Sequence, residues 1–174
     1  MCIRDSSIGQ VVRYGTHGIC SVEDITVKSF CGQELRYYVL KPVHQESATI
    51  FVPVDNEKLT GRMQRLLTAQ QILEVIGGMD EEDRLWIDDD AQRRDAYNEI
   101  LRDGDRVGMA RIIKTLFLRQ QELAGKRKKL HIADEKILKE TERVLYEEFA
   151  YVLGIGQDEV LPFILQKLGA QQVI

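Results

Sequence analysis

Residues 8–27 read IGQVVRYGTHGICSVEDITV, in which two runs rich in Val and Ile lie on either side of a glycine-flanked turn. β-Branched residues favour strands, and glycine allows the chain to bend between them. We therefore predict a first strand at Val11–Val12 and a second at Ile19–Val27, separated by the turn Tyr14–Gly18. The chain begins with short strands.

Two further segments continue this pattern. Leu35–Leu40 and Thr49–Val52 are again rich in Val, Ile, Tyr and Phe. A hairpin loop at Ser29–Gln33 and a longer connection at Pro42–Ser47 separate them from their neighbours. Four short strands before Pro53 predict a small, barrel-like antiparallel sheet.

From Thr68 onwards the apolar residues recur at helical spacing, and Thr68 is suited to cap the first helix. The predicted helices span residues 69–76, about 91–102, a stretch after Gly104-Asp105, about 132–153 and about 158–168. The third has an apolar stripe made of Val107, Ala110, Ile113, Leu116 and Phe117. The fold class is therefore α+β, with a sheet followed by an all-α region.

We divide the chain into three segments. Residues 1–6, MCIRDS, resemble neither a signal nor a transit peptide, and we interpret them as an artefactual or disordered tail in place of the natural start. Residues 7–76 form the sheet domain and residues 79–174 the helical domain. Gly77-Gly78 ends a helix and marks the boundary.

Charge and cysteine content exclude several classes of protein. The formal net charge of −4 gives no general attraction to nucleic acid, so binding to DNA would need a focused basic patch. No apolar run has the length of a membrane-spanning helix, and three cysteines do not make a disulfide framework. We expect a monomer in the cytoplasm that has no membrane contact.

Two clusters of side chains contain residue types that bind metal ions. The acidic residues of 80–83 and 88–90 offer carboxylates, but consecutive carboxylates point in different directions and are typical of solvated helix starts. His17, Cys20 and Cys31 could meet across the sheet, but they lack a fourth ligand. Motifs of hydrolases, phosphate-binding loops and zinc proteases are missing from the sequence. We expect no catalytic set, metal or cofactor.

Three features indicate binding instead. The basic run Lys126-Arg127-Lys128-Lys129 could neutralise phosphates or could be a solvated loop between helices. Trp86, the only tryptophan, belongs to no periodic apolar face, and it is either an aromatic wedge for a base step or a packing residue. Phe51 either faces the core or points outward from a strand that pairs with a partner's strand.

Ordered motifs in both halves of the chain carry a resemblance. In the first half they are Ile8-Gly9-Gln10-Val11-Val12, Tyr14-x-x-His17-Gly18, Tyr37-Tyr38-Val39-Leu40-Lys41 and Val52-Pro53-Val54-Asp55-Asn56. In the second half they are Trp86, Arg93-Arg94, Gly104-Asp105, the apolar third helix, and Leu130 through Glu135-Lys136 to Leu153. In this combination, residues 7–168 resemble the CarD/CdnL family of bacterial RNA polymerase-binding transcription regulators.

The resemblance implies a Tudor-like N-terminal domain, a small antiparallel β-barrel that docks on the polymerase β subunit. It also implies a helical C-terminal domain that contacts promoter DNA weakly, without sequence specificity, at the upstream edge of the bubble. The polymerase-contact candidates are Lys28, Ile50, Phe51, Val52 and Pro53. The DNA-contact candidates are the wedge Trp86 and the basic residues Arg93, Arg94, Lys126, Arg127 and Lys136.

Two functions follow from these features. The first is a non-enzymatic transcription regulator that binds the polymerase β subunit and stabilises the promoter open complex. The second is a polymerase-bound adaptor that contacts another protein instead of DNA, which the acidic residues of 77–125 favour. A third hypothesis, a metal-dependent enzyme, has only the acidic cluster in its favour.

Overall fold

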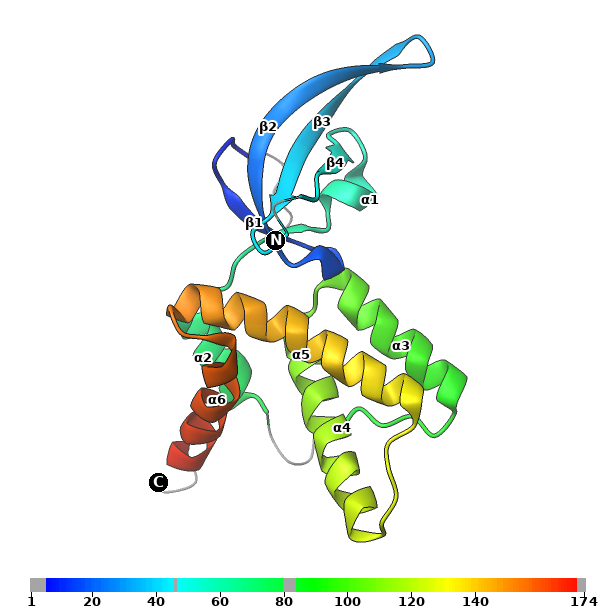
Figure 1. Ribbon diagram of the computed structural model, residues 1–174, viewed down its shortest axis with the longest axis vertical. Coiled ribbons are helices and arrows are strands. Elements are labelled where there is room, and N and C mark those ends of the chain that lie inside the picture. The colour runs from blue at the N-terminus through cyan, green and yellow to red at the C-terminus, as the bar shows by residue number, and fades with distance from the viewer. Residues whose placement is uncertain (1–5, 46, 80–83, 172–174) are drawn as a thin grey trace. The chain divides into compact units, whose positions relative to one another are not determined.

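The computed structural model describes residues 6–45, 47–79 and 84–171. The chain forms two compact units, Met1–Leu66 and Leu67–Ile174. The first contains the strands and the second the helices α2 to α6 (Figure 1), so the predicted α+β class is confirmed. Ser6, which we assigned to the tail, is buried and belongs to the folded structure.

The sheet unit contains five antiparallel strands in the order β4-β3-β2-β1-β5. Four of them confirm the predicted strands, whereas β5 was missed because its three residues, Met-Gln-Arg, carry no strand pattern. Within the described ranges no pairing joins β4 to β5, so closure into a barrel is not observed. The bounds are β1 Val11–Tyr14, β2 Ile19–Phe30, β3 Gln33–Pro42, β4 Ile50–Pro53 and β5 Met63–Arg65, with the short helices η1 Gly15–His17 and α1 Glu57–Thr60.

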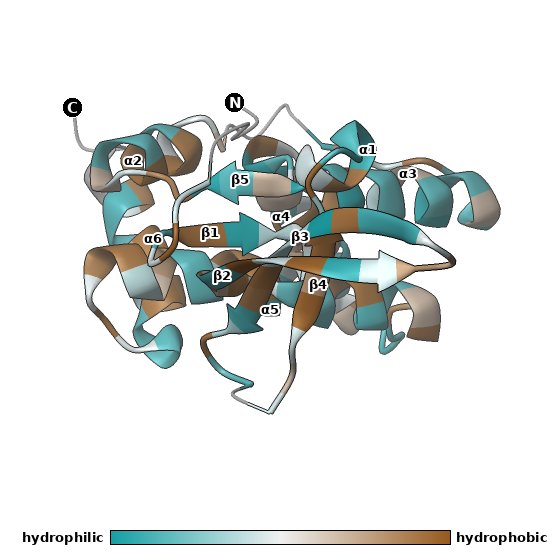
Figure 2. Cartoon of the chain, turned by 90° about the horizontal axis from the view of Figure 1, so that it is seen from above, coloured by the Kyte–Doolittle hydropathy of each residue, from teal (hydrophilic) through white to brown (hydrophobic). Residues whose placement is uncertain are grey.

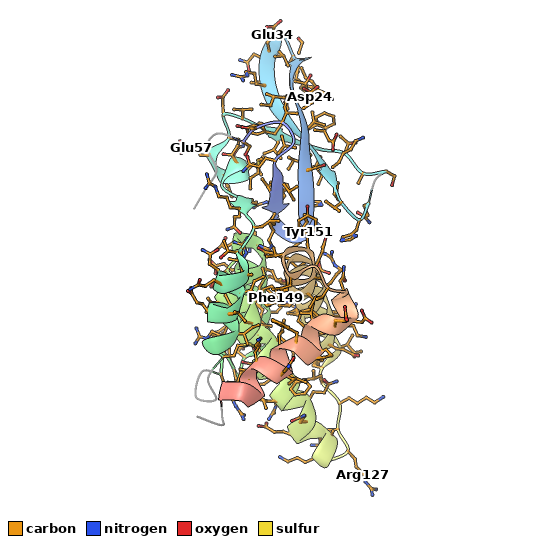
Figure 3. All side chains as sticks on the ribbon, turned by 90° about the vertical axis from the view of Figure 1, so that its left-hand side faces the viewer. Asp24, Glu34, Glu57, Arg127, Phe149 and Tyr151 are labelled. Carbon is orange, nitrogen blue, oxygen red and sulfur yellow. The ribbon has the colours of Figure 1, made fainter. Side chains whose placement is uncertain are left out.

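A long hairpin of β2 and β3 dominates the sheet unit, and Glu34 lies at its tip (Figure 3). The tight turn puts Cys31 and Gly32 at positive φ, 50° and 77°. Cys20 lies at the base of β2, about 35 Å along an extended strand from Cys31. These two thiols cannot bind one metal ion together. The core of the unit consists of Val12, Tyr14, Cys20, Val22, Tyr38, Leu40, Val52 and Met63.

The helical unit confirms all five predicted helices. Thr68 caps α2, accepting a hydrogen bond from the Gln71 backbone N–H, and Gln71 returns one to complete a capping box. Asp105 caps α4 by accepting a hydrogen bond from the Gly108 backbone N–H. The bounds are α2 Ala69–Gly77, α3 Asp90–Asp103, α4 Arg106–Gly125, α5 Ile132–Leu153 and α6 Gln157–Gln171. No helix in the described ranges is long and apolar enough to cross a membrane.

The apolar stripe of α4 differs from the prediction. Val107 and Phe117 are exposed, whereas Met109, Ile112 and Leu116 are completely buried. Helix α4 packs against α2, α3 and α5, so its buried face is wider and rotated relative to a single stripe. The colouring by hydropathy shows the contrast with α3, which is mostly hydrophilic (Figure 2).

The boundary between the units lies between Leu66 and Leu67, earlier than the expected boundary at Gly77-Gly78. Helix α2 belongs to the helical unit because its residues Ile72 and Ile76 are buried in that core. The buried Glu148 side chain also accepts a hydrogen bond from the Leu67 backbone N–H at 2.9 Å. Burial of one apolar face therefore decides to which unit α2 belongs.

Candidate functional site

The edge strand β4 presents Phe51 on the outer face of the sheet. Phe51 is 42 % exposed, while the next residue, Val52, is completely buried on the other face. The Lys28 Nζ atom lies 3.5 Å from the centre of the Phe51 ring, and Tyr37 meets this ring edge-on at 6.4 Å. Lys28 and Phe51, which are exposed, and the half-buried Tyr37 form a group that we call the outer-face patch. Of the two orientations considered for Phe51, the structure shows the outward one.

The other residues of β4 contribute in a different way. Ile50 and Pro53 are half-buried, and the Val52 side chain fills the core. Strand β4 is the last in the strand order, so β3 is its only strand neighbour in the described part of the sheet. A partner strand added there would use main-chain hydrogen bonds, with Phe51 as the exposed side chain.

A short irregular stretch before α3, residues 84–88, carries Trp86, and we call it the Trp86 segment. The Thr115 hydroxyl accepts a hydrogen bond from the Leu85 N–H at 2.9 Å, and the Tyr97 hydroxyl donates one to the Leu85 carbonyl at 2.6 Å. Arg93 donates another to the Ile87 carbonyl at 2.7 Å. Side chains from α3 and α4 therefore fix a segment that has no secondary structure of its own.

The Trp86 indole is half-buried and is surrounded by charged groups. Its Nε1 atom donates a hydrogen bond to Asp88 Oδ1 at 2.9 Å. The guanidinium carbons of Arg93 and Arg119 lie 4.2 Å and 4.9 Å from the ring centre. The indole also packs against the helical core. The ring is therefore packed and still partly accessible.

Arg93 is a structural residue rather than a surface cation, contrary to the expected phosphate contact. Its side chain is only 2 % exposed. It forms a two-pronged ion pair with Asp134 on α5, at 3.0 Å and 2.7 Å, and a further bond with Asp90 at 2.7 Å. The hydrogen bond to Asp134 raises the pKa of Arg93 and outweighs burial, which lowers it. With these donors occupied inside the protein, Arg93 is not presented to DNA.

The aspartates that follow Trp86 each have a local role. Asp88 holds the indole N–H, and Asp89 caps α3 by accepting a hydrogen bond from the Gln92 N–H at 2.8 Å. Asp90 binds Arg93, and this hydrogen bond lowers the pKa of Asp90. These contacts offset part of the negative charge beside the indole. The acidic residues 80–83 lie outside the described residues.

The other basic candidates are exposed. Arg94 lies on α3 and Lys136 near the start of α5, while Lys126 and Arg127 form the turn after α4. Arg127 points outward at this end of α4 (Figure 3). The helical rise places Lys126 about 10 Å along the axis from Arg119. The structure brings Arg93 and Arg119 to Trp86, and it places Lys126 and Arg127 further along the same helix.

Arg127, like Cys31, is a residue other than glycine with a left-handed backbone. Its φ of 55° lies in the left-handed region, where a helix-ending residue is usually glycine. A side chain in this conformation costs about 1 kcal/mol relative to glycine. An arginine at this position destabilises the fold locally. Residues in such strained conformations are common where the side chain has a function.

Sequence reasoning missed the groups that fix the Trp86 segment. Asp134, Tyr97, Thr115 and Arg119 are distant from Trp86 in sequence, and no spacing rule connects them. Asp134 did leave one signal, because it lies three and four residues before Ile137 and Leu138 and so shares their buried face. A carboxylate on an apolar stripe indicates a buried ion pair.

The cluster of His17, Cys20 and Cys31 is not assembled. His17 stacks on Tyr14 at 5.8 Å between ring centres, Cys20 is buried, and Cys31 is exposed at the hairpin turn. In the described parts of the chain, no group of three or more His, Cys, Asp or Glu residues is arranged to hold a metal ion.

The two units, one with an exposed strand edge and one with a fixed aromatic beside basic residues, define a two-module binding protein. Residues 7–67 match the family model described as the CarD-like/TRCF RID domain, and residues 71–164 match that of the CarD C-terminal domain. The chain therefore belongs to the CarD family, as its motifs indicated. It is an RNA polymerase-interacting transcription regulator, and families of this type are transcription factors rather than enzymes.

Proposed function

We propose that this protein docks on the β subunit of RNA polymerase through its sheet unit and stabilises the promoter open complex through its helical unit. The DNA contacts are weak, independent of sequence and located at the upstream edge of the bubble. The protein works in the cytoplasm, at the nucleoid, as a monomer without a cofactor. The observation that carries the proposal is the joining of both matched modules in one chain with a fixed, partly exposed tryptophan.

Strand β4 and the outer-face patch are the proposed docking site for polymerase. The free edge of β4 would pair with a strand of the β subunit through the main-chain groups of Phe51 and the carbonyl of Pro53, because Ile50 and Val52 turn their main-chain groups toward β3. The side chains of Phe51 and Lys28 would contact the side chains of that strand. Because the ring lies under a cation, this contact combines apolar area with positive charge.

This docking site is tested by Phe51→Ala in the full-length protein. We expect at least tenfold weaker binding to polymerase, because the exposed ring is the main apolar group of the patch. Phe30→Ala is the matched control, because Phe30 is another exposed phenylalanine of the sheet unit, at the end of β2. Equal affinities of the two variants would contradict the proposed docking site.

Trp86 and the exposed basic residues Arg94, Lys126, Arg127 and Lys136 are the proposed DNA contacts. An aromatic ring stacks on unpaired or distorted base steps regardless of their sequence, and cations bind the phosphates. A regulator shifts the equilibrium between closed and open promoters only by its difference in affinity for the two. A difference of about 1.4 kcal/mol changes the ratio tenfold.

The wedge is tested by Trp86→Ala in transcription complexes formed with the full-length protein. We expect polymerase binding to be unchanged and the lifetime of the open complex to fall by about tenfold. Tyr151→Ala is the control, since Tyr151 is an exposed aromatic residue of the same unit on α5. If both variants give the wild-type lifetime, the wedge role of Trp86 is wrong.

The phosphate contacts are tested by Arg127→Gly, which removes a charge and also relieves the left-handed backbone. Stability of the protein should rise by about 1 kcal/mol, and the slope of DNA affinity against salt should fall by about one unit. Removal of the exposed cation Lys167, on α6, should leave that slope unchanged.

The adaptor without DNA contact remains the alternative, and the carboxylates around Trp86 favour it. The two functions differ in their response to salt, because phosphate contacts release counterions. The test is a variant that lacks the charges of Arg94, Lys126, Arg127 and Lys136. If its stabilising effect on open complexes shows the same salt dependence as that of wild type, the adaptor function is correct.

A further inference from the structure

Trp86 is held more firmly than an exposed wedge would need. Its indole contacts two guanidinium groups and one carboxylate, and the backbone on both sides of it is hydrogen-bonded to α3 and α4. A half-buried ring with only apolar neighbours could still turn about its side-chain bonds. Here the N–H edge of the indole has a fixed partner, Asp88.

We propose that Arg119 and Asp88 are positioning residues that hold the Trp86 indole in one orientation before it meets DNA. This inference rests on the proposed wedge function of Trp86. Arg119 stacks on the ring, and Asp88 fixes the edge of the ring, so each restricts a different movement. Neither residue needs to touch DNA for this role.

Arg119 is itself held in place by a chain of charges. Its Nη1 atom lies 3.3 Å from Glu122 Oε2, and the other oxygen of Glu122 binds Arg84 at 2.6 Å. Arg84 belongs to the Trp86 segment. The contacts of Arg119 therefore lead back to the segment that carries Trp86. Hydrogen bonds from these two arginines, from Arg84 most strongly, lower the pKa of Glu122.

The two arginines beside the indole have different consequences for the fold. Arg93 is buried and paired with Asp134, so its removal would disturb the whole unit. Arg119 has a side chain that is 40 % exposed, and its pair with Glu122 lies at the surface. Arg119 can therefore be replaced without unfolding the protein, which makes the proposal testable.

Positioning changes function through entropy. Immobilising a flexible side chain on binding costs about 0.5–1.5 kcal/mol, which corresponds to a factor of about two to ten in affinity. If the ring is already fixed in the free protein, this cost has been met during folding. Loss of either positioning residue should shorten the open-complex lifetime by about two- to tenfold, less than or equal to the effect of Trp86→Ala.

Because Trp86 is the only tryptophan, its fluorescence in the free full-length protein reports on the indole directly. In Arg119→Ala we expect lower anisotropy, from faster local rotation, and easier quenching by acrylamide. Arg119→Lys keeps the charge but loses the flat guanidinium, so it should resemble Arg119→Ala. Arg143→Ala is the control, because Arg143 forms a comparable surface pair with Glu140 on α5.

Asp88 is tested by two variants that both remove its charge. Asp88→Asn keeps an oxygen that can accept the indole hydrogen bond, whereas Asp88→Ala does not. Repulsion of phosphates by Asp88 would change in the same way in both variants. Positioning predicts lower anisotropy and a shorter open-complex lifetime for Asp88→Ala than for Asp88→Asn.

The outcomes separate this inference from the proposed function. Wild-type anisotropy in both Arg119→Ala and Asp88→Ala would overturn the positioning role, whatever the transcription assays give. Wild-type behaviour of Arg119→Lys in both assays would also overturn it, because Arg119 would then act only as a charge. If anisotropy falls but Trp86→Ala itself leaves the open-complex lifetime unchanged, the indole is positioned as proposed and the wedge function is wrong.

Discussion

Both units place an aromatic ring under a cation, but they hold that cation differently. In the sheet unit, Lys28 over Phe51 is exposed, and the ring is kept in place by the strand that carries it. In the helical unit, Arg93 beside Trp86 is buried and is bound by Asp134 and Asp90. A strand positions its side chains through main-chain pairing, whereas an irregular segment needs side chains from other elements. Similar ring contacts therefore have very different consequences for stability.

The largest expected effect is that of Arg93→Ala. It should lower the free energy of unfolding of the helical unit by about 3–5 kcal/mol, because Asp134 would be left buried without its partner. Lys28→Ala, its counterpart in the sheet unit, should cost no more than about 1 kcal/mol. Denaturant titrations of the two variants measure both values.

A double variant sharpens this first test. Arg93→Met with Asp134→Leu replaces the ion pair by apolar groups of similar volume, and it should restore most of the lost stability. Similar losses for Arg93→Ala and Lys28→Ala would contradict the contrast between the two units.

The next effect concerns two tyrosines of the helical unit, in both of which burial raises the pKa to about 12. The Tyr97 hydroxyl donates to the Leu85 carbonyl, whereas the Tyr146 hydroxyl is buried without a partner in the described part of the chain. Tyr97→Phe should lower the free energy of unfolding by about 1–3 kcal/mol, and Tyr146→Phe should raise it by about 1 kcal/mol. If the Tyr97 hydroxyl helps to fix the Trp86 segment, the midpoint of thermal unfolding should fall for Tyr97→Phe and rise for Tyr146→Phe.

A smaller effect is expected for the outer-face patch. The coupling energy between Lys28 and Phe51, from a double-mutant cycle with alanine at each position, should be about 0.5–1 kcal/mol at this exposed site. The coupling should weaken little in high salt, since most of it comes from contact with the ring face. A value above about 3 kcal/mol would place this pair in the same class as Arg93 and Asp134.

The smallest effect depends on pH. Burial raises the pKa of Glu142 above its ordinary value of 4.5, so the folded state binds its proton more tightly than the unfolded state. The contribution of Glu142 to stability should therefore fall as pH rises above 4.5 and level off above the raised pKa. Glu142→Gln should remove this decline. The free energy of unfolding of the variant should therefore rise relative to wild type at neutral pH but not at acidic pH. Equal unfolding curves at both pH values would show that burial of Glu142 carries no cost.

Much of the fold could be predicted because local patterns carry it. Alternating and β-branched residues marked four strands, and Thr68 marked the start of α2. The short strand β5 and the rotated face of α4 escaped prediction, since both depend on neighbours that are distant in sequence. For the candidate site, Trp86, the exposed Phe51 and the basic turn were found as isolated residues. Arg93 was expected to contact DNA, but its charge is buried and paired with Asp134, which the sequence does not reveal.

The sequence by itself determined four of the five strands, the helices α2 to α6, the cap of α2 and the family, because each depends on residues close together in the chain or on ordered motifs. Only the tertiary structure decided which charges are free and which are committed. Arg93 and Arg94 are neighbours in sequence, yet one is bound by Asp134 inside the protein and the other is exposed. The reason is physical: pairing across forty-one residues depends on how α3 packs against α5, and burial without such a pair would be too costly for an ion.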